Sequence, residues 1–235
     1  MRLDKYLCIR GLAQSRNKAI ELIKDGRVKV GGKRVKKPSL EVSDNDIIDI
    51  DSYRQYVSRA ALKLKGFLEE FPLDIEHKSC MDIGASTGGF TEILLENGAA
   101  EVYCIDVGSN QLSNNLKSNE KVKNFEKCDI RGFECDRVFD IITCDVSFIS
   151  VINIIKDIDR FAKDKIIILF KPQFEVGREA KRDKAGVVID EDAINAAMQR
   201  VEKAAEKLGW RLIGKNRSKL KGKEGNVEWF YLFEK

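Results

Sequence analysis

Hydrophobic residues follow two alternating patterns from about residue 59 to the end of the chain. Short apolar runs predict strands at 80–83, 101–106, 141–145, 165–170, 211–214 and 228–233. Apolar residues at helical spacing predict helices at 59–70, 90–97, 151–163 and 190–208. This alternation is typical of an α/β domain, so we expect a Rossmann-like sheet that is mostly parallel and has an antiparallel C-terminal edge.

The first fifty residues show a different pattern. Residues 15–24 place apolar side chains at helical spacing, with Ser15 as the N-cap and Gly26 as the stop signal. Polar and apolar residues then alternate in 27–30, and Gly31-Gly32 predicts a tight turn into a second strand. A helix followed by a hairpin is therefore expected.

A further short strand at 44–49 completes this N-terminal part, and a polar stretch without clear periodicity follows it. We therefore expect a small α+β domain at 1–50, a linker at 51–58 and the α/β domain at 59–235.

Positive charge is concentrated at the start of the chain. The net charge is only +4, but residues 1–37 hold 12 Lys or Arg against three acidic residues, whereas the rest holds 30 against 35. A short, strongly basic segment is typical of a module that contacts phosphates of a nucleic acid. Charge alone leaves open the alternative of a solvated basic surface with no partner.

Composition excludes several other classes of protein. No apolar run approaches the roughly 18 residues of a membrane span, and the first residues are charged, so we expect a cytoplasmic protein without membrane contact. We also expect a monomer. The six cysteines form no C-x-x-C pair and mostly lie in apolar runs. We expect reduced core thiols and no metal site.

A glycine-rich motif follows the first predicted strand of the α/β domain. Residues 82–90 read D-I-G-A-S-T-G-G-F, where glycines let the backbone approach a ligand at a strand-to-helix turn. Neither the phosphate-binding pattern G-x-x-x-x-G-K-S/T nor the dinucleotide-binding pattern G-x-G-x-x-G matches. With Asp106 ending the next strand, the motif resembles the S-adenosylmethionine site of Rossmann-like methyltransferases, in which Asp106 would hold the ribose hydroxyls.

The residues after the later strands bear on which atom would be methylated. Enzymes that methylate an exocyclic base nitrogen usually have Asn or Asp followed by Pro-Pro-aromatic at the end of the fourth strand. Enzymes that methylate cytosine carbon-5 need a Pro-Cys nucleophile there. This chain instead has Asp145-Val146-Ser147-Phe148. A ribose hydroxyl must lose its proton as it attacks, and a lysine of lowered pKa can assist. Lys171 ends the next strand, and Asp145 could orient its ammonium.

The N-terminal pattern R-L-D-K-Y-L, followed by S-R-x-x-A-x-x-L-I-x-x-G-x-V-x-V-x-G, resembles the S-four-type RNA-binding domain. That domain also occurs in tRNA synthetases and pseudouridine synthases, so it indicates RNA rather than a reaction. In the family, the helix with the S-R pair and the hairpin present basic side chains to RNA. The resemblance thus points to Arg2, Lys5, Arg16, Lys18, Arg27 and Lys33, and we add Arg59 from the second domain.

Five motifs together resemble the TlyA (hemolysin A) family, which is related to the FtsJ ribosomal-RNA 2′-O-methyltransferases. They are V-S-R-A-A-L-K-L from residue 57, G-A-S-T-G-G-F-T, D-V-S-F-I-S, F-K-P-Q-F-E-V-G and G-N-V-E-W-F. The resemblance implies a catalytic tetrad of Lys63, Asp145, Lys171 and Glu228. It also implies an S-adenosylmethionine site formed by Gly84, Ala85, Ser86, Thr87, Gly88, Phe90, Asp106, Val107 and Asp129, with Asp129 near the adenine amine.

The activity implied is methylation of a cytidine ribose 2′-hydroxyl in ribosomal RNA, within ribosomal subunits. Three alternatives stay open from the sequence. They are a pore-forming hemolysin, as the family name suggests, an RNA-binding ribosome assembly factor with little catalysis, and a base methyltransferase.

Overall fold

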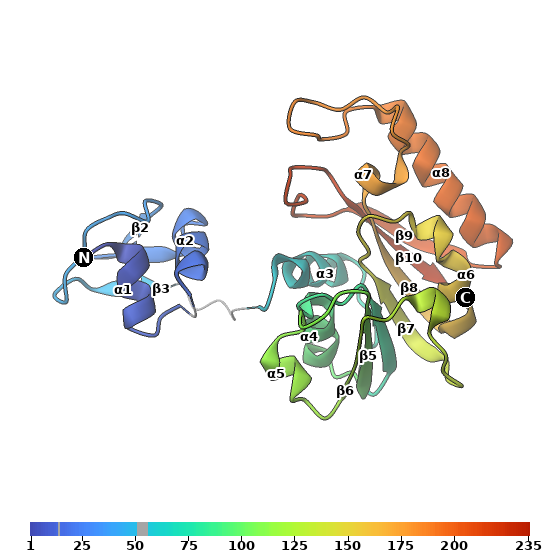
Figure 1. Ribbon diagram of the computed structural model, residues 1–235, viewed down its shortest axis with the longest axis horizontal. Helices are drawn as coiled ribbons and strands as arrows, with labels where there is room; N and C mark the ends of the chain where they lie inside the picture. Colours follow the sequence, from blue (N-terminus) through green and yellow to red (C-terminus); the bar gives the residue numbers. More distant parts are fainter. Residues whose placement is uncertain (14, 51–55) are drawn as a thin grey trace. The chain divides into compact units, whose positions relative to one another are not determined.

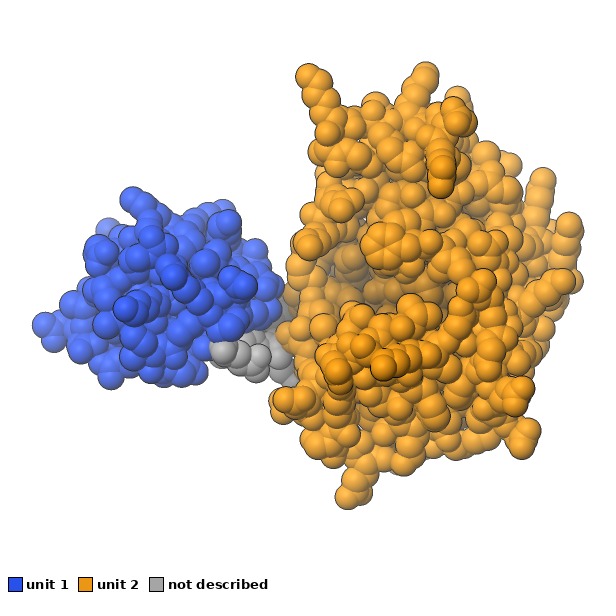
Figure 2. All heavy atoms as spheres, in the orientation of Figure 1, with its two compact units in different colours: residues 1–55 blue, residues 56–235 orange. Residues whose placement is uncertain are grey.

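The computed structural model describes residues 1–13, 15–50 and 56–235. Its residues divide into two compact units, Met1–Gln55 and Tyr56–Lys235, which we call the N-terminal and C-terminal units (Figure 2). Most of the predicted linker 51–58 lies outside the described residues. Its last part differs from the prediction, because Tyr56 is buried in the core of the C-terminal unit and the backbone N–H of Val57 donates to Glu92 there.

The N-terminal unit is a small α+β fold. The structure confirms the predicted helix, whose N-cap Ser15 accepts a hydrogen bond from the backbone N–H of Lys18. A preceding helix was not predicted, because its seven residues are too few to show a helical repeat. The elements are α1 (Leu3–Ile9), α2 (Arg16–Lys24), β1 (Val28–Val30), β2 (Lys33–Val35) and β3 (Ile48–Ile50), with strand order β2-β1-β3.

A buried aspartate joins the two helices of this unit. Asp4 on α1 is fully buried, and its carboxylate pairs with Arg2 at 3.0 Å and with Arg16 of α2 at 3.0 Å. Hydrogen bonds from Arg2, supported by Arg16, lower the pKa of Asp4 to about 2. The R-L-D and S-R motifs of the sequence therefore meet at one carboxylate.

In the described part of the C-terminal unit, seven strands form one sheet in the order β6-β5-β4-β7-β8-β10-β9 (Figure 1). Neighbours from β6 to β8 are parallel, whereas β10 is antiparallel to β8 and β9, as predicted. The strands are β4 (Ser79–Ile83), β5 (Glu101–Asp106), β6 (Val122–Glu126), β7 (Phe139–Cys144), β8 (Ala162–Phe170), β9 (Arg211–Arg217) and β10 (Trp229–Glu234).

Helices cover both faces of this sheet (Figure 1). Helices α3 and α4 pack with Ile167 and Leu169 of β8, whereas α6 and α8 pack with Ile166 and Ile168, because successive strand residues point to opposite faces. No described helix is long and apolar enough to cross a lipid bilayer. The helices are α3 (Arg59–Glu70), α4 (Gly89–Glu96), α5 (Asn114–Lys117), α6 (Ile155–Phe161), α7 (Pro172–Glu175) and α8 (Glu191–Lys207).

Two local predictions for this unit were wrong. Strand β6 was missed, because V-K-N-F-E is mostly polar and lies at the exposed edge of the sheet. The helix predicted at 151–163 is instead a 3₁₀ turn (Val151–Asn153) followed by α6, and the chain enters β8 at Ala162. Apolar residues there serve a helix and a buried strand in succession, and periodicity alone does not mark the change.

The Asp4 contacts predict how the N-terminal unit responds to mutation and acid. Replacing Asp4 by Ala removes charge-assisted hydrogen bonds to Arg2 and Arg16, which should cost about 1–3 kcal/mol in the unfolding free energy of this unit. Because the pKa of Asp4 is lowered from 3.8 to about 2, its stabilisation is present above pH 4 and lost as the pH falls toward 2.

Hydrogen exchange of amides in residues 1–50, measured on the full-length protein, checks this prediction. Asp44→Ala is the matched control, because Asp44 pairs with Arg10 at the exposed surface. An exposed pair of this kind contributes about 1 kcal/mol or less. Equal losses of protection in the two variants would contradict the special role of Asp4.

Candidate active site

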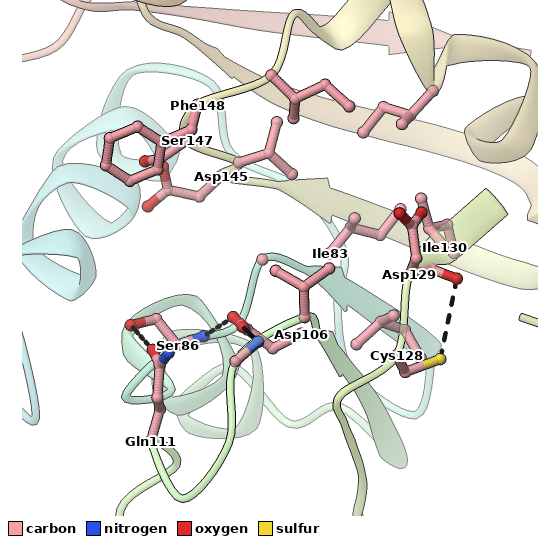
Figure 3. Close-up of a pocket in the computed structure, with 17 residues that line it drawn as sticks. Ile83, Ser86, Asp106, Gln111, Cys128, Asp129, Ile130, Asp145, Ser147 and Phe148 are labelled. Atoms are coloured by element: carbon pink, nitrogen blue, oxygen red, sulfur yellow. Dashed lines mark hydrogen bonds between the residues drawn. The ribbon is translucent and has the colours of Figure 1, made fainter. Parts of the chain in front are cut away.

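The carboxyl ends of the parallel strands meet at one edge of the sheet, where the loops that follow them enclose a cavity of about 430 Å³ (Figure 3). That volume lies within the roughly 300–1,000 Å³ typical of small-molecule sites. Loops after β4, β5, β6 and β7 each contribute to the wall, which is the position expected for a ligand in a doubly wound sheet. Apolar side chains dominate one part of the wall, among them Ile83, Ile105 and Ile130.

The first loop is anchored by a buried carboxylate. One oxygen of Asp82 accepts from the backbone N–H and hydroxyl of Thr91 at 2.9 and 2.7 Å, and the other accepts from the Thr143 hydroxyl at 2.9 Å. Burial raises the pKa of Asp82 to about 6. Asp82 therefore ties β4 to α4 and β7 and holds the loop, and it does not line the larger cavity.

Gly84 is required by the close approach of two backbones. Its φ is +80°, and a Cβ added there would lie 2.8 Å from the backbone oxygen of Asp145. Any side chain would strain the backbone and push the loop away from the end of β7. Gly88 is restricted by its backbone, because its φ is +93°, and a Cβ there would also displace the side chains of Leu116 and Leu112.

Asp106 occupies the end of β5, as predicted, and lines the cavity. One carboxylate oxygen accepts from the backbone N–H of Ser86 and the other from that of Gly108, both at 2.7 Å (Figure 3). Each carboxylate oxygen can accept more than one hydrogen bond. The arrangement therefore fixes the carboxylate while leaving it able to accept from a pair of neighbouring hydroxyls.

The predicted cofactor residues fall into three groups: those that line the larger cavity, those that line a smaller one, and one that lines neither. Gly84, Ser86, Asp106, Val107 and Asp129 line the cavity. A smaller cavity of about 210 Å³, which shares Gly84 and Asp145 with the first, is lined by Ala85, Thr87 and Phe90, and the Phe90 side chain belongs to the core. Gly88 lines neither cavity and packs below the loop.

Asp129 forms an ion pair with Arg131, which was not among the predicted site residues. Its carboxylate accepts from the backbone N–H of Arg131 at 3.0 Å and pairs with the Arg131 guanidinium at 2.5 Å. The guanidinium lowers the pKa of Asp129. Asp129 lies at the cavity wall, but much of its hydrogen-bonding capacity is already used.

The four residues of the predicted tetrad form two ion pairs. Lys63 Nζ lies 2.5 Å from Glu228 Oε2, and Lys171 Nζ lies 2.6 Å from Asp145 Oδ1. Asp145 follows β7, Lys171 follows β8, and Glu228 precedes the antiparallel β10. Since Phe170 is the register partner of Trp229, three of the residues are brought to one edge of adjacent strands, and α3 supplies Lys63.

These charges act on one another in a site of low exposure. The four side chains are between 3% and 15% exposed. Burial raises the pKa of Asp145 against the opposing effect of Lys171, and the more distant charges of Lys63 and Glu228 also act on it. Lys171 Nζ in addition donates to Ser147 Oγ at 2.9 Å. The four side chains can therefore position a polar ligand beside the Lys171 ammonium, which Asp145 and Ser147 hold in place.

A further contact joins the loops that carry Asp145 and Lys171. Glu175 on α7 accepts from the Ser150 hydroxyl at 2.6 Å and from the backbone N–H of Val151 at 2.8 Å. Burial raises the pKa of Glu175. Ser150 ends the motif D-V-S-F-I-S, and Glu175 lies within F-K-P-Q-F-E-V-G, but neither residue was assigned a role from the sequence. Their presence in these two motifs was the available signal.

The predicted RNA-binding residues are only partly brought together. Arg2 and Arg16 share Asp4, and Lys18 pairs with Glu21 at 3.0 Å. Lys5 and Lys33 are exposed, and Arg27 is half-buried. In the C-terminal unit, exposed Arg59 donates to the backbone oxygen of Lys221 at 3.2 Å.

Known proteins match both units. The FtsJ-like methyltransferase family matches residues 56–235, and the S4 domain matches residues 1–48. The 23S rRNA (cytidine-2′-O)-methyltransferase TlyA of Campylobacter jejuni is 49% identical over 253 residues, covering 100% of both chains. The 16S/23S rRNA (cytidine-2′-O)-methyltransferase TlyA of Mycobacterium tuberculosis is 40% identical and covers 97% of this chain and 88% of its own.

A solved structure of a putative hemolysin from Streptococcus thermophilus is 33% identical, with a TM-score of 0.75, and the match covers 100% of this chain and 88% of that one. The resemblance drawn from the motifs is thus confirmed over the full length of the chain. The chain belongs to the FtsJ-like methyltransferase family, and within it to the TlyA proteins.

Proposed function

We propose that this protein transfers a methyl group from S-adenosylmethionine to the 2′-hydroxyl of a cytidine in ribosomal RNA. The observation that carries the proposal is the pair of buried ion pairs, Lys63–Glu228 and Lys171–Asp145, beside a cavity of small-molecule size. The two TlyA relatives are named for cytidine 2′-O-methylation of 23S rRNA, and one of them also for 16S rRNA. Large-subunit RNA, within ribosomal subunits in the cytoplasm, is therefore the first substrate to test.

The residues around the larger cavity fit S-adenosylmethionine. Asp106 can accept from both ribose hydroxyls, Gly84 lines the cavity without a side chain, and Ile130 with its apolar neighbours offers a surface for the adenine. When bound, the cofactor supplies an electrophilic methyl group on a sulfonium. Asp145 and Ser147 line the same cavity, so the tetrad borders the region in which that methyl would lie.

Within the tetrad, Lys171 is placed to act on the acceptor hydroxyl. In its neutral form Lys171 takes the proton that the hydroxyl loses on attack, and Asp145 holds the ammonium that results. Lys63 and Glu228, paired with each other beside them, position the ribose. The N-terminal unit, with its basic surface and the S4 match, anchors the RNA.

Mapping of methyl groups on ribosomal RNA from each subunit, with and without the protein, tests this function. We expect a 2′-O-methylcytidine, identified by nuclease digestion and mass spectrometry, in large-subunit RNA only when the protein is present. A methyl group on a base would point instead to a base methyltransferase, and RNA binding with no methylation would favour an assembly factor. Lysis of erythrocytes by the purified protein tests the hemolysin alternative.

Lys171→Ala should lower the turnover of methyl transfer ~100-fold or more, because general-base assistance is typically of that size. Affinity for S-adenosylmethionine, measured by calorimetry, should stay nearly unchanged, since Lys171 acts on the acceptor. Lys171→Arg should not restore turnover, because a guanidinium stays protonated at working pH. A Lys171→Ala enzyme that keeps more than about a tenth of wild-type turnover would refute the role.

Glu175→Ala should lower turnover about tenfold or more by releasing the loop that carries Asp145, because small misplacements of catalytic groups are costly. The expected signature is a lower kcat with nearly unchanged cofactor affinity and nearly unchanged KM for RNA. Glu175→Gln keeps one acceptor and should recover part of the loss, and Ser150→Ala removes a single hydrogen bond and should have a smaller effect. A loss shared equally by kcat and thermal stability in all three variants would indicate a purely structural contact.

A further inference from the structure

A short basic segment lies near the C-terminal end of the chain, in a unit that is otherwise not basic. Residues 56–235 hold 29 Lys or Arg against 30 Asp or Glu, yet residues 215–223 hold five cations and no carboxylate. The five are Lys215, Arg217, Lys219, Lys221 and Lys223. A cluster of positive charges on a nearly neutral unit attracts negatively charged partners.

Three of the five cations already have partners within the protein. Lys215 pairs with Glu202 at 2.8 Å, and Lys219 pairs with Glu69 at 2.9 Å. The Arg217 guanidinium lies over the Trp229 ring at 4.9 Å. These contacts are internal to the protein and leave the segment with less free charge than its sequence indicates.

The other two cations, Lys221 and Lys223, are exposed, and within the described ranges neither forms an ion pair with a carboxylate. They flank Gly222, whose backbone lies against the tetrad. A Cβ added to Gly222 would be 2.6 Å from Glu228 Oε1, and the Gly222 N–H donates to Asn226 at 2.8 Å. The turn therefore passes directly over the Glu228 carboxylate.

A third cation is held at the same place by the backbone. Arg59 donates to the Lys221 carbonyl at 3.2 Å, and Arg59 lies one helical turn before Lys63 on α3. Arg59, Lys221 and Lys223, which we call the rim cations, thus come from the two segments that carry or pass over the Lys63–Glu228 pair. Each is exposed while the pair beneath them is buried.

We propose that the rim cations bind the backbone phosphates next to the target ribose, which gives the C-terminal unit an RNA contact of its own. The inference rests on the proposed function. Every ribose is flanked by phosphates, so a ribose at the tetrad brings anions to this rim. Lys63 is already paired with Glu228, so the exposed cations above that pair offer the positive charge that these phosphates would meet.

The double variant Lys221→Ala with Lys223→Ala, made in the full-length chain, tests the proposal. The matched control is Lys215→Ala with Lys219→Ala, which removes the same charge from the same segment but from internally paired lysines. RNA affinity is measured against salt concentration with a large-subunit ribosomal RNA transcript. Each lost phosphate contact should make the log–log slope shallower by roughly 0.7 to 0.9, so the rim variant should change and the control should not.

Steady-state methylation adds a second readout. The rim variant should raise KM for RNA about tenfold or more with a small change in kcat, and cofactor affinity should be unchanged. Equal slopes for wild type, rim variant and control would overturn the proposal. An equal loss of binding to RNA and to phosphatidylglycerol vesicles would also overturn it, because it would show general attraction to polyanions. A wild-type protein that binds RNA but methylates no ribose would refute the proposed function and leave the comparison of slopes intact.

Discussion

The antiparallel pairing of β10 with β8 is the constraint on which the site depends. Trp229 opposes Phe170, so Glu228 and Lys171 leave the sheet side by side although they are far apart in the chain. The register is set by two cores at once, because Phe230 packs toward α3 and α4 whereas Tyr231 packs toward α6 and α8. A slip by one residue would exchange these faces, so packing over the whole sheet holds the two proposed catalytic positions in place.

The tetrad adds little to stability by itself. Burying two ion pairs costs hydration free energy that is only roughly offset by the attraction within each pair. Proteins in which such pairs are replaced by apolar residues are often equally stable. Their burial at the strand ends is therefore better explained by chemistry than by folding. The sheet and the loop anchored by Asp82 form the rigid framework that holds the four charged side chains in position.

The sequence predicted much of the fold because its signals were local. Strong apolar runs located β5 and β8, and the Ser15 cap located the start of α2. Strand β6 escaped because an exposed edge strand need not be apolar. The helix at 151–163 was misplaced because one apolar stretch serves two elements in succession.

For the site, the family resemblance suggested the tetrad, and the neighbouring strand ends suggested that Asp145 pairs with Lys171, which the structure places 2.6 Å apart. The pairing of Lys63 with Glu228 was not predicted, because the two residues are 165 positions apart and meet only through the packing of α3 against the end of β10. The contacts of Arg131 with Asp129 and of Glu175 with Ser150 were not predicted either, because side-chain hydrogen bonds in irregular segments leave no periodic pattern in a sequence.

The contact between Gly84 and the backbone of Asp145 also has a mechanical meaning. With no side chain between the two backbones, the glycine loop and the end of β7 have no slack, and a tightly packed interior transmits displacement. The position of the glycine loop and the position of Asp145, the partner of Lys171, are therefore fixed against each other. The residues proposed to hold the methyl donor and those proposed to prepare the acceptor share one fixed point of backbone packing rather than two independent ones.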